Sequence, residues 1–188
     1  AVLNPIVEVA WVEEKSIADA HPGEFAVSRR GTVAAANVKK ESGEVLTFVS
    51  TYAPWESPLK QLGNWIYADS SAHRVISDLS AMIGSQRGHR IVVAGDWNAL
   101  RGYGEHGSPY WGERYKTIFD RFAAIGLPFA GPEAPNGWQA DPWPDELPKD
   151  SLCVPTYHTG HMTPATAERQ LDFEFASKNL PIRVSAKN

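Results

Sequence analysis

The sequence predicts a mixed α/β sandwich, because segments with strand patterns alternate along the chain with two segments of helical spacing. The 188 residues are 43% hydrophobic and 21% charged, a composition typical of one globular domain with a sizeable core. No internal repeat or low-complexity tract interrupts the order of these segments. We therefore expect residues 1–188 to form a single domain.

Strands are predicted where apolar and polar residues alternate between turn-forming residues. In the first part of the chain these segments are residues 5–12 (PIVEVAWV), 24–29 (EFAVSR), 32–38 (TVAAANV) and 43–54 (GEVLTFVSTYAP). Pro54 ends the last of them, because proline cannot donate to a ladder. Toward the end of the chain, we expect strands at residues 154–158 (VPTYH) and 169–177 (RQLDFEFAS), and the start of another at 180–186 (LPIRVSA).

Two segments place apolar residues on one face of a helix. The first lies between residues 70 and 84, and its apolar positions are Ala72, Val75, Ile76, Leu79, Met82 and Ile83. The second carries Tyr115, Ile118, Phe119 and Phe122, with Gly126 past its end. Residues 131–155 are rich in proline, aspartate and tryptophan, and we expect them to form one long ordered loop.

Charge and cysteine content limit the classes of ligand. The formal net charge is -4 with both signs interspersed, so a phosphate or nucleic-acid ligand needs local Arg, Lys or a metal ion. Cys153 is the only cysteine, which excludes an internal disulfide and a four-cysteine zinc site. Cys153, His158 and His161 together offer three zinc ligands, and the fourth ligand of a structural zinc site is missing. No apolar run has the length of a membrane span, so we expect a soluble protein, cytoplasmic by default.

One strand pattern ends in a carboxylate and an amide, within residues 91–100 (IVVAGDWNAL). In extended backbone, Asp96 and Asn98 project to the same side where the strand leaves the core. Such a pair offers oxygen ligands to magnesium, or a base for water beside a donor for a phosphate oxygen. Asp and Asn also close turns by bonding to their own backbone. The pair therefore has a catalytic and a structural interpretation.

Three further segments accompany this motif in a fixed order. Tyr52 precedes a proline turn at the end of a predicted strand, Thr-Tyr-His occupies residues 156–158, and Arg-x-Leu-Asp-Phe occupies residues 169–173 with Asp172 facing away from its apolar neighbours. Together they resemble the endonuclease/exonuclease/phosphatase family, which includes deoxyribonuclease I and the abasic-site endonucleases. The resemblance covers about residues 25–177. It implies a four-layer sandwich of two mixed β-sheets flanked by helices.

The resemblance also implies a phosphoesterase, active on phosphodiesters or phosphomonoesters through a water activated beside Mg²⁺ or Mn²⁺. Asp96 would orient or deprotonate the water, and Asn98 would hold a phosphate oxygen. Tyr52 would donate a hydrogen bond to the phosphate, and Asp172 would ligate the metal together with Asp96. The substrate class stays open among nucleic acid, which would make the protein a nuclease, nucleotides and small phosphate esters.

Four residues are candidate substrate contacts. Arg169 is the basic residue expected nearest the phosphate. His158 ends a predicted strand, and His106 lies on a glycine-rich loop. Trp97 adjoins the motif residues and would stack on a base or sugar. A loop role for the histidines and a core role for the tryptophan are the structural alternatives.

The sequence departs from the family at both ends. It contains no Gln-Glu dipeptide and no Ser-Asp-His motif. In the family, the first supplies a metal ligand and the second supplies the histidine that contacts the phosphate. We therefore expect a domain incomplete at its termini, whose open sheet edges are covered by self-association. Two alternatives to the enzyme remain, a catalytically incomplete module that binds phosphates or a partner, and an aromatic-rich carbohydrate-binding sandwich.

Overall fold

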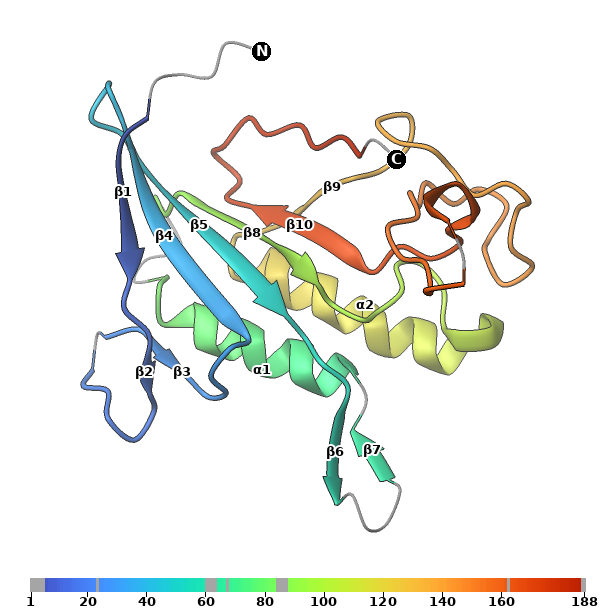
Figure 1. The fold of residues 1–188 in the computed structure, drawn as a ribbon, viewed down its shortest axis with the longest axis horizontal. Helices are drawn as coiled ribbons and strands as arrows, with labels where there is room; N and C mark the ends of the chain where they lie inside the picture. Colours follow the sequence, from blue (N-terminus) through green and yellow to red (C-terminus); the bar gives the residue numbers. More distant parts are fainter. Residues whose placement is uncertain are drawn as a thin grey trace.

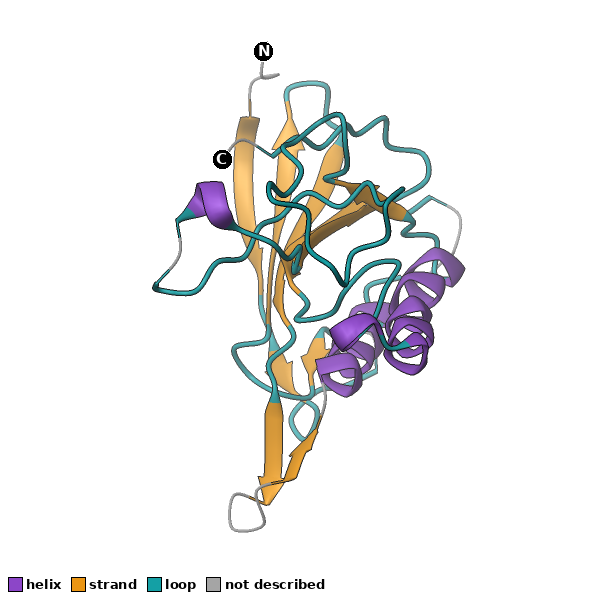
Figure 2. Cartoon of the chain, turned by 90° about the vertical axis from the view of Figure 1, so that its right-hand side faces the viewer, coloured by secondary structure: helices purple, strands orange, loops and turns teal. Residues whose placement is uncertain are grey.

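The computed structural model describes residues 6–22, 24–59, 64–66, 68–83, 88–161 and 163–186. Its largest element is a six-stranded sheet with the order β1-β4-β5-β8-β10-β9. Helices α1 (Ala68–Ser80) and α2 (Pro109–Ala124) pack on one face of this sheet (Figures 1 and 2). The chain therefore has the mixed α/β class that the sequence predicts.

The sheet mixes one parallel pair with antiparallel pairs. Strands β5 and β8 run parallel, since α1 lies between them in the chain, and the other neighbours run antiparallel. The six strands are β1 (Ile6–Val12), β4 (Val33–Lys40), β5 (Val45–Tyr52), β8 (Ile91–Asp96), β9 (Phe129–Gly131) and β10 (Asp172–Ala176).

Two short pairs of strands lie outside the main sheet. The first joins β2 (Lys15–Ser16) to β3 (Ala26–Val27), so the strand predicted at residues 24–29 is shorter than expected. The second joins β6 (Glu56–Leu59) to β7 (Asn64–Ile66).

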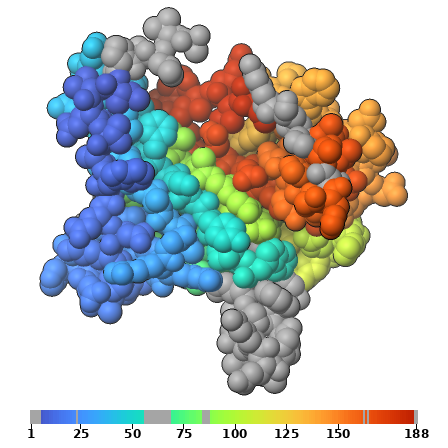
Figure 3. Space-filling view, viewed as in Figure 1, coloured from blue at the N-terminus to red at the C-terminus, as the bar shows by residue number. Residues whose placement is uncertain are grey.

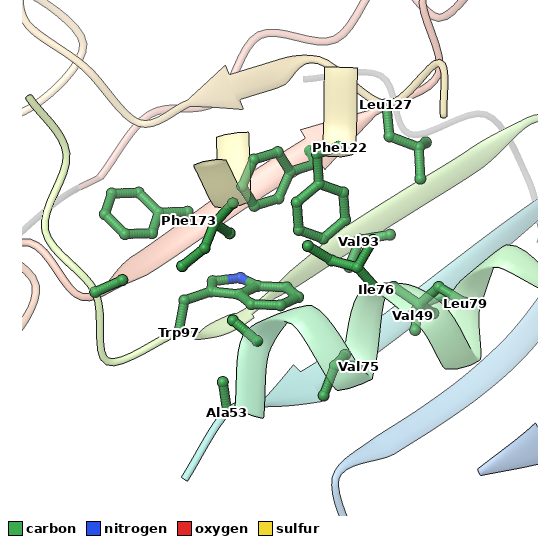
Figure 4. Packing of buried hydrophobic residues seen from close by; sticks show 14 of the residues in the cluster. Val49, Ala53, Val75, Ile76, Leu79, Val93, Trp97, Phe122, Leu127 and Phe173 are labelled. Carbon is green, nitrogen blue, oxygen red and sulfur yellow. The ribbon is translucent and has the colours of Figure 1, made fainter. Parts of the chain in front are cut away.

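The core lies between the helices and the inner face of the sheet (Figure 4). Side chains at helical spacing are buried on α1 and α2, as the sequence predicts, and those of alternate strand positions meet them. The buried residues of these elements include Ala72, Val75, Ile76, Leu79, Tyr115, Ile118, Phe122, Val49, Val93, Phe173 and Phe175.

The opposite face of the sheet is covered by neither helix. On β5, Val49 and Thr51 are buried toward the helices, whereas Phe48 and Tyr52 point the other way and are 44% and 47% exposed. In the space-filling view, β5 and β8 reach the surface as a cyan and green band (Figure 3). The described residues thus form one large sheet and one helix layer. The second large sheet and second helix layer that the resemblance implies are not among them.

Two predicted strands near the end of the chain do not form. Residues 154–158 make only an isolated bridge between Tyr157 and Arg169, because the side chain of Thr156, and not its backbone, accepts the neighbouring N–H groups. Residues 180–186 contain no strand. There, Pro181 has no N–H to donate to a ladder, and the Ile182 N–H donates locally to the Leu180 carbonyl at 2.9 Å.

The loop at residues 131–155 agrees with its prediction: beyond the last residue of β9, it contains turns and bends but no helix or strand. Neither α1 nor α2, among the described residues, combines the length and apolar character that a membrane crossing requires. Edge strand β1 exposes Val9 and Trp11, which are 54% and 78% accessible. Self-association through such surfaces stays a prediction, as does the single-domain organisation.

Candidate functional site

Three of the predicted site residues lie side by side at the ends of three neighbouring strands. The parallel register of β5 and β8 pairs Tyr52 with Asp96. The antiparallel register of β8 and β10 pairs Asp96 with Asp172. Residues paired in register point to the same face of a sheet, here the face opposite the helices. We call Tyr52, Asp96 and Asp172 the Asp96 row.

The two carboxylates of the row belong to the closer kind of antiparallel pair. In the next pair along the ladder, the Trp97 N–H donates to the Leu171 carbonyl at 2.9 Å. Hydrogen-bonded and non-hydrogen-bonded pairs alternate, and the non-hydrogen-bonded kind brings Cα atoms to about 4.5 Å. The Asp172 N–H accordingly points away from β8 and donates to Thr156 Oγ1 at 3.0 Å. The backbones of Asp96 and Asp172 are therefore close, with both side chains on the same face of the sheet.

Asp96 is half-buried, and its environment favours the protonated form. Burial raises the pKa of its carboxyl above the ordinary range, and the charge of Asp172 raises it further. The Asn98 N–H, which donates to Asp96 Oδ1 at 2.9 Å, opposes this shift. The Asp96 carboxylate therefore accepts a proton more readily than a solvated aspartate does. The hydrogen bond from the Asn98 N–H to Oδ1 holds it in place.

Asn98 closes the turn that follows β8. Its backbone has a φ of 47°, in the left-handed region that asparagine tolerates better than most residues. Its Nδ2 donates to the Ala53 carbonyl at 3.1 Å, and the Ala53 N–H donates to the Asp96 carbonyl at 2.8 Å. Asn98 therefore has a structural role in the turn, which joins the ends of β5 and β8 beside the row; its predicted contact with a phosphate oxygen stays a prediction.

Gly95 is a requirement of the site that the sequence analysis missed. A Cβ at this position would lie 1.9 Å from the Thr51 carbonyl oxygen, so only glycine lets β8 approach β5 this closely. An isolated glycine inside a strand pattern is the sequence signal for such an approach. The register of Tyr52 and Asp96, one residue further on, depends on it.

The prediction that Trp97 contacts substrate is wrong. The side chain is 0% exposed and packs edge-on against Phe122, with ring centroids 4.9 Å apart (Figure 4). It also packs edge-on against Phe175, with ring centroids 5.7 Å apart. Side chains alternate along an extended chain, so the residue after Asp96 points to the helices. Trp97 is a core residue.

Arg169 lies near the row in sequence, but its charge is already paired. The guanidinium is half-buried between Glu105 and Glu146, with N–O distances of 2.9 and 2.8 Å. Arg169 therefore joins the glycine-rich loop and the loop at residues 131–155 to the start of β10. For its predicted contact with phosphate, the Arg169 guanidinium would have to leave one of these two carboxylates or bind the phosphate in addition to them.

Both candidate histidines are exposed; His106 lies in a 3-10 turn at Glu105–Gly107, and His158 lies in a loop. His106 has a φ of 53°, and its N–H donates to Glu146 Oε2 at 3.0 Å. His158 Nδ1 lies 3.1 Å from the Thr159 carbonyl oxygen. Within the described residues, no hydrogen bond joins either ring to the Asp96 row, so their predicted substrate contacts stay predictions.

The donor set of the row fits a hard divalent cation. Mg²⁺ in proteins is typically held by one or two carboxylates, with water and substrate oxygens completing the shell, and Asp96 and Asp172 are two adjacent carboxylates of like charge. Across the described ranges, no group of three or more His, Cys, Asp or Glu side chains is arranged to hold a metal. Cys153 is buried and donates to the Arg101 carbonyl at 3.3 Å, as a core residue does.

A cavity of about 490 Å³ lies apart from this row. Its lining includes Arg101, Gly104, Lys116 and Phe119, on α2 and the loop before it, and none of the Asp96 row. We place the candidate site at the row nevertheless, because the strand register aligns two carboxylates and a hydroxyl of the row on one face of the sheet.

Comparisons with known proteins identify no family by sequence. No family model matches the chain, and no curated protein matches it. Among solved structures, the chain is similar to a β-hairpin deletion mutant of beta toxin from Staphylococcus aureus, with 13% identity and a TM-score of 0.45 over 82% of this chain and 47% of that one.

Two further structures are phosphatases by name. The chain is 16% identical to the mannosyl-6-phosphatase Bt3783 of Bacteroides thetaiotaomicron, with a TM-score of 0.39 over 78% of this chain and 43% of that one. It is 14% identical to ANGEL2, a 2',3'-cyclic phosphatase, with a TM-score of 0.35 over 93% and 55%. The chain spans about half the length of these structures.

Proposed function

We propose that the chain forms the catalytic face of a metal-dependent phosphoesterase, with the Asp96 row as its reactive residues. The observation that carries this proposal is the strand register, which aligns Tyr52, Asp96 and Asp172 from three distant parts of the sequence. The motif resemblance assigns these same residues to one chemistry, independently of their positions in space. A structural row of unrelated surface residues would not be expected to coincide with that assignment.

In this proposal, Asp96 takes the proton from the attacking water. One carboxylate oxygen is occupied by the Asn98 N–H, which leaves the other to face the water. Burial raises the pKa of this carboxyl, and a general base works better as its pKa approaches the operating pH. In the absence of a metal ion, Asp96 is thus both oriented and made more basic by its surroundings.

The remaining residues act on the phosphate. Tyr52 is 47% exposed beside Asp96, so its hydroxyl can donate to an oxygen that gains charge in the transition state. The Nδ2 of Asn98 has a second N–H besides the one donated to the Ala53 carbonyl. This second N–H would donate to a phosphate oxygen. Asp96 and Asp172 would hold Mg²⁺ or Mn²⁺, which when bound supplies neutralisation of the negative phosphate oxygens.

A catalytically incomplete, phosphate-binding module is the second candidate. The observation that favours it is the small number of carboxylates at the row, since no third metal ligand accompanies Asp96 and Asp172 among the described residues. The carbohydrate-binding alternative loses one of its aromatic residues, because Trp97 is buried. A nuclease, a nucleotide phosphatase and a small-ester phosphatase all remain within the first proposal.

The test is hydrolysis of bis-p-nitrophenyl phosphate and of a supercoiled plasmid with Mg²⁺ or Mn²⁺. We expect Asp96→Ala to lower kcat by about 100-fold or more, the contribution of a general base. Asp150→Asn, which changes an exposed carboxylate in the loop at residues 131–155, is the matched control and keeps the rate. Equal rates for wild type and Asp96→Ala would refute the role of Asp96. A wild type that hydrolyses neither diester, nor the monoester p-nitrophenyl phosphate, would refute the proposal and favour the binding module.

A further inference from the structure

The start of β10 lacks a strand neighbour on the side away from β8. Strand β9 pairs only with Glu174 and Phe175, so the N–H groups of the preceding residues need another acceptor. The hydroxyl of Thr156 provides it, since Oγ1 accepts the Leu171 N–H at 3.1 Å and the Asp172 N–H at 3.0 Å. A single side-chain oxygen thus replaces the missing strand at Asp172.

Thr156 is itself held by the segment that it binds. Its backbone N–H and that of Tyr157 both donate to the Arg169 carbonyl, at 2.9 and 3.0 Å. The hydrogen bonds therefore run in both directions between residues 156–157 and 169–172. This explains why the predicted strand at residues 154–158 is only an isolated bridge: its bonds converge on two acceptors and do not extend along a ladder.

Two neighbouring side chains hold the same segment from the loops. Gln170 is 1% exposed, its Oε1 accepts the Val154 N–H at 3.0 Å, and its Nε2 donates to the Pro132 carbonyl at 2.8 Å. Arg169 is paired with Glu105 and Glu146. Gln170 Nε2 also lies 3.5 Å from the Asp172 carbonyl oxygen, whereas the Thr156 hydroxyl accepts the Asp172 N–H.

We propose that Thr156 is a positioning residue, whose hydroxyl fixes the Asp172 backbone and thereby places its carboxylate opposite Asp96. The kinetic part of this inference rests on the proposed phosphoesterase function. Strand ends that are paired on one side only open locally at lower free-energy cost than the middle of a sheet, and Asp172 is the first residue of β10. Displacing a catalytic group by about 1 Å costs on the order of 100-fold in rate. A role of Thr156 in stability alone would not act selectively on turnover.

The kinetic experiment compares Thr156→Val, which removes the hydroxyl at nearly constant volume, with Thr156→Ser, which keeps it. We expect Thr156→Val to lower kcat by about 10-fold to 100-fold with KM within about twofold, and Thr156→Ser to restore kcat to within about threefold of wild type. Thr166→Val is the control, because the Thr166 hydroxyl bonds to Thr163, away from the row. A wild-type kcat in Thr156→Val, or a Thr156→Ser variant as slow as Thr156→Val, would overturn the proposal.

A second readout does not need activity. In the metal-free wild type, amide hydrogen exchange followed by NMR must show the Leu171 and Asp172 N–H groups protected; unprotected amides would overturn the proposal even if Thr156→Val fails to fold. In folded Thr156→Val we expect both amides to exchange at least about 10-fold faster, with Phe173 and Phe175 unchanged. If the wild type hydrolyses no phosphoester, the proposed function fails, and unchanged exchange at Asp172 would separately refute the positioning role.

Discussion

Replacing Asn98 separates two contributions of this residue to the turn after β8. The backbone φ of 47° disfavours residues with a Cβ other than asparagine and aspartate. The side-chain Nδ2 donates to the Ala53 carbonyl at 3.1 Å. Asn98→Ala loses the hydrogen bond and strains the backbone, whereas Asn98→Gly loses the hydrogen bond without that strain. Both variants keep the N–H that donates to Asp96.

The two costs are similar in size. A net hydrogen bond is worth about 1 kcal/mol, and a Cβ in the left-handed region costs about 1 kcal/mol more. We therefore expect the free energy of unfolding to fall by about 2 kcal/mol in Asn98→Ala and by about 1 kcal/mol in Asn98→Gly. For a chain of this length, these values correspond to decreases in Tm of about 4–8 °C and about 2–4 °C.

The measurement is thermal unfolding by circular dichroism, repeated with guanidinium chloride at 25 °C. Asn179 is the matched control position, because it lies in an exposed turn and is not among the described non-glycine residues with positive φ. At Asn179 alanine should be at least as stable as glycine, since glycine has the greater entropy to lose on folding. An Asn98→Ala variant as stable as Asn98→Gly would refute the argument from backbone conformation.

Two further predictions concern the packing and charge of the row. Gly95→Ala should lower the free energy of unfolding by about 1–3 kcal/mol through overpacking, because its Cβ would meet the Thr51 carbonyl oxygen. Gly160→Ala is the control and should be tolerated, since nothing lies within 4 Å of its Cβ. Equal denaturation midpoints for the two variants would contradict this prediction. Asp172→Asn should move the titration of Asp96, followed by carboxyl ¹³C NMR without metal, to lower pH, because it removes one of the causes that raise the Asp96 pKa. An unchanged or higher midpoint would show that the two carboxylates do not interact.

Local patterns predicted both helices and the longer strands of the main sheet, but not β9 or the pair β6–β7. Helix α1 buries Ala72, Val75, Ile76 and Leu79 as their spacing predicts, although it ends at Ser80 and not near residue 84. Predictions failed where side chains satisfy the backbone, as at Thr156, or where proline interrupts it, as at Pro181. Those outcomes depend on which hydrogen-bond acceptor lies nearby in space, and periodicity carries no information about that.

For the candidate site as well, some features follow from local sequence patterns and others depend on tertiary contacts. Asp96 and Asn98 were recognisable from sequence, because a buried strand that ends in a carboxylate and an amide is a local pattern. The opposite orientations of Asp96 and Trp97 follow from the alternation of side chains, yet which of the two faces the core depends on where α2 packs. The placement of Tyr52 and Asp172 on either side of Asp96 depends on strand register, which is set by hydrogen bonds between distant segments. The pairing of Arg169 with Glu105 and Glu146, and of the Thr156 hydroxyl with the Asp172 backbone, arises from the same folding of remote segments onto one another, because a side chain acquires its partners only when the chain is compact.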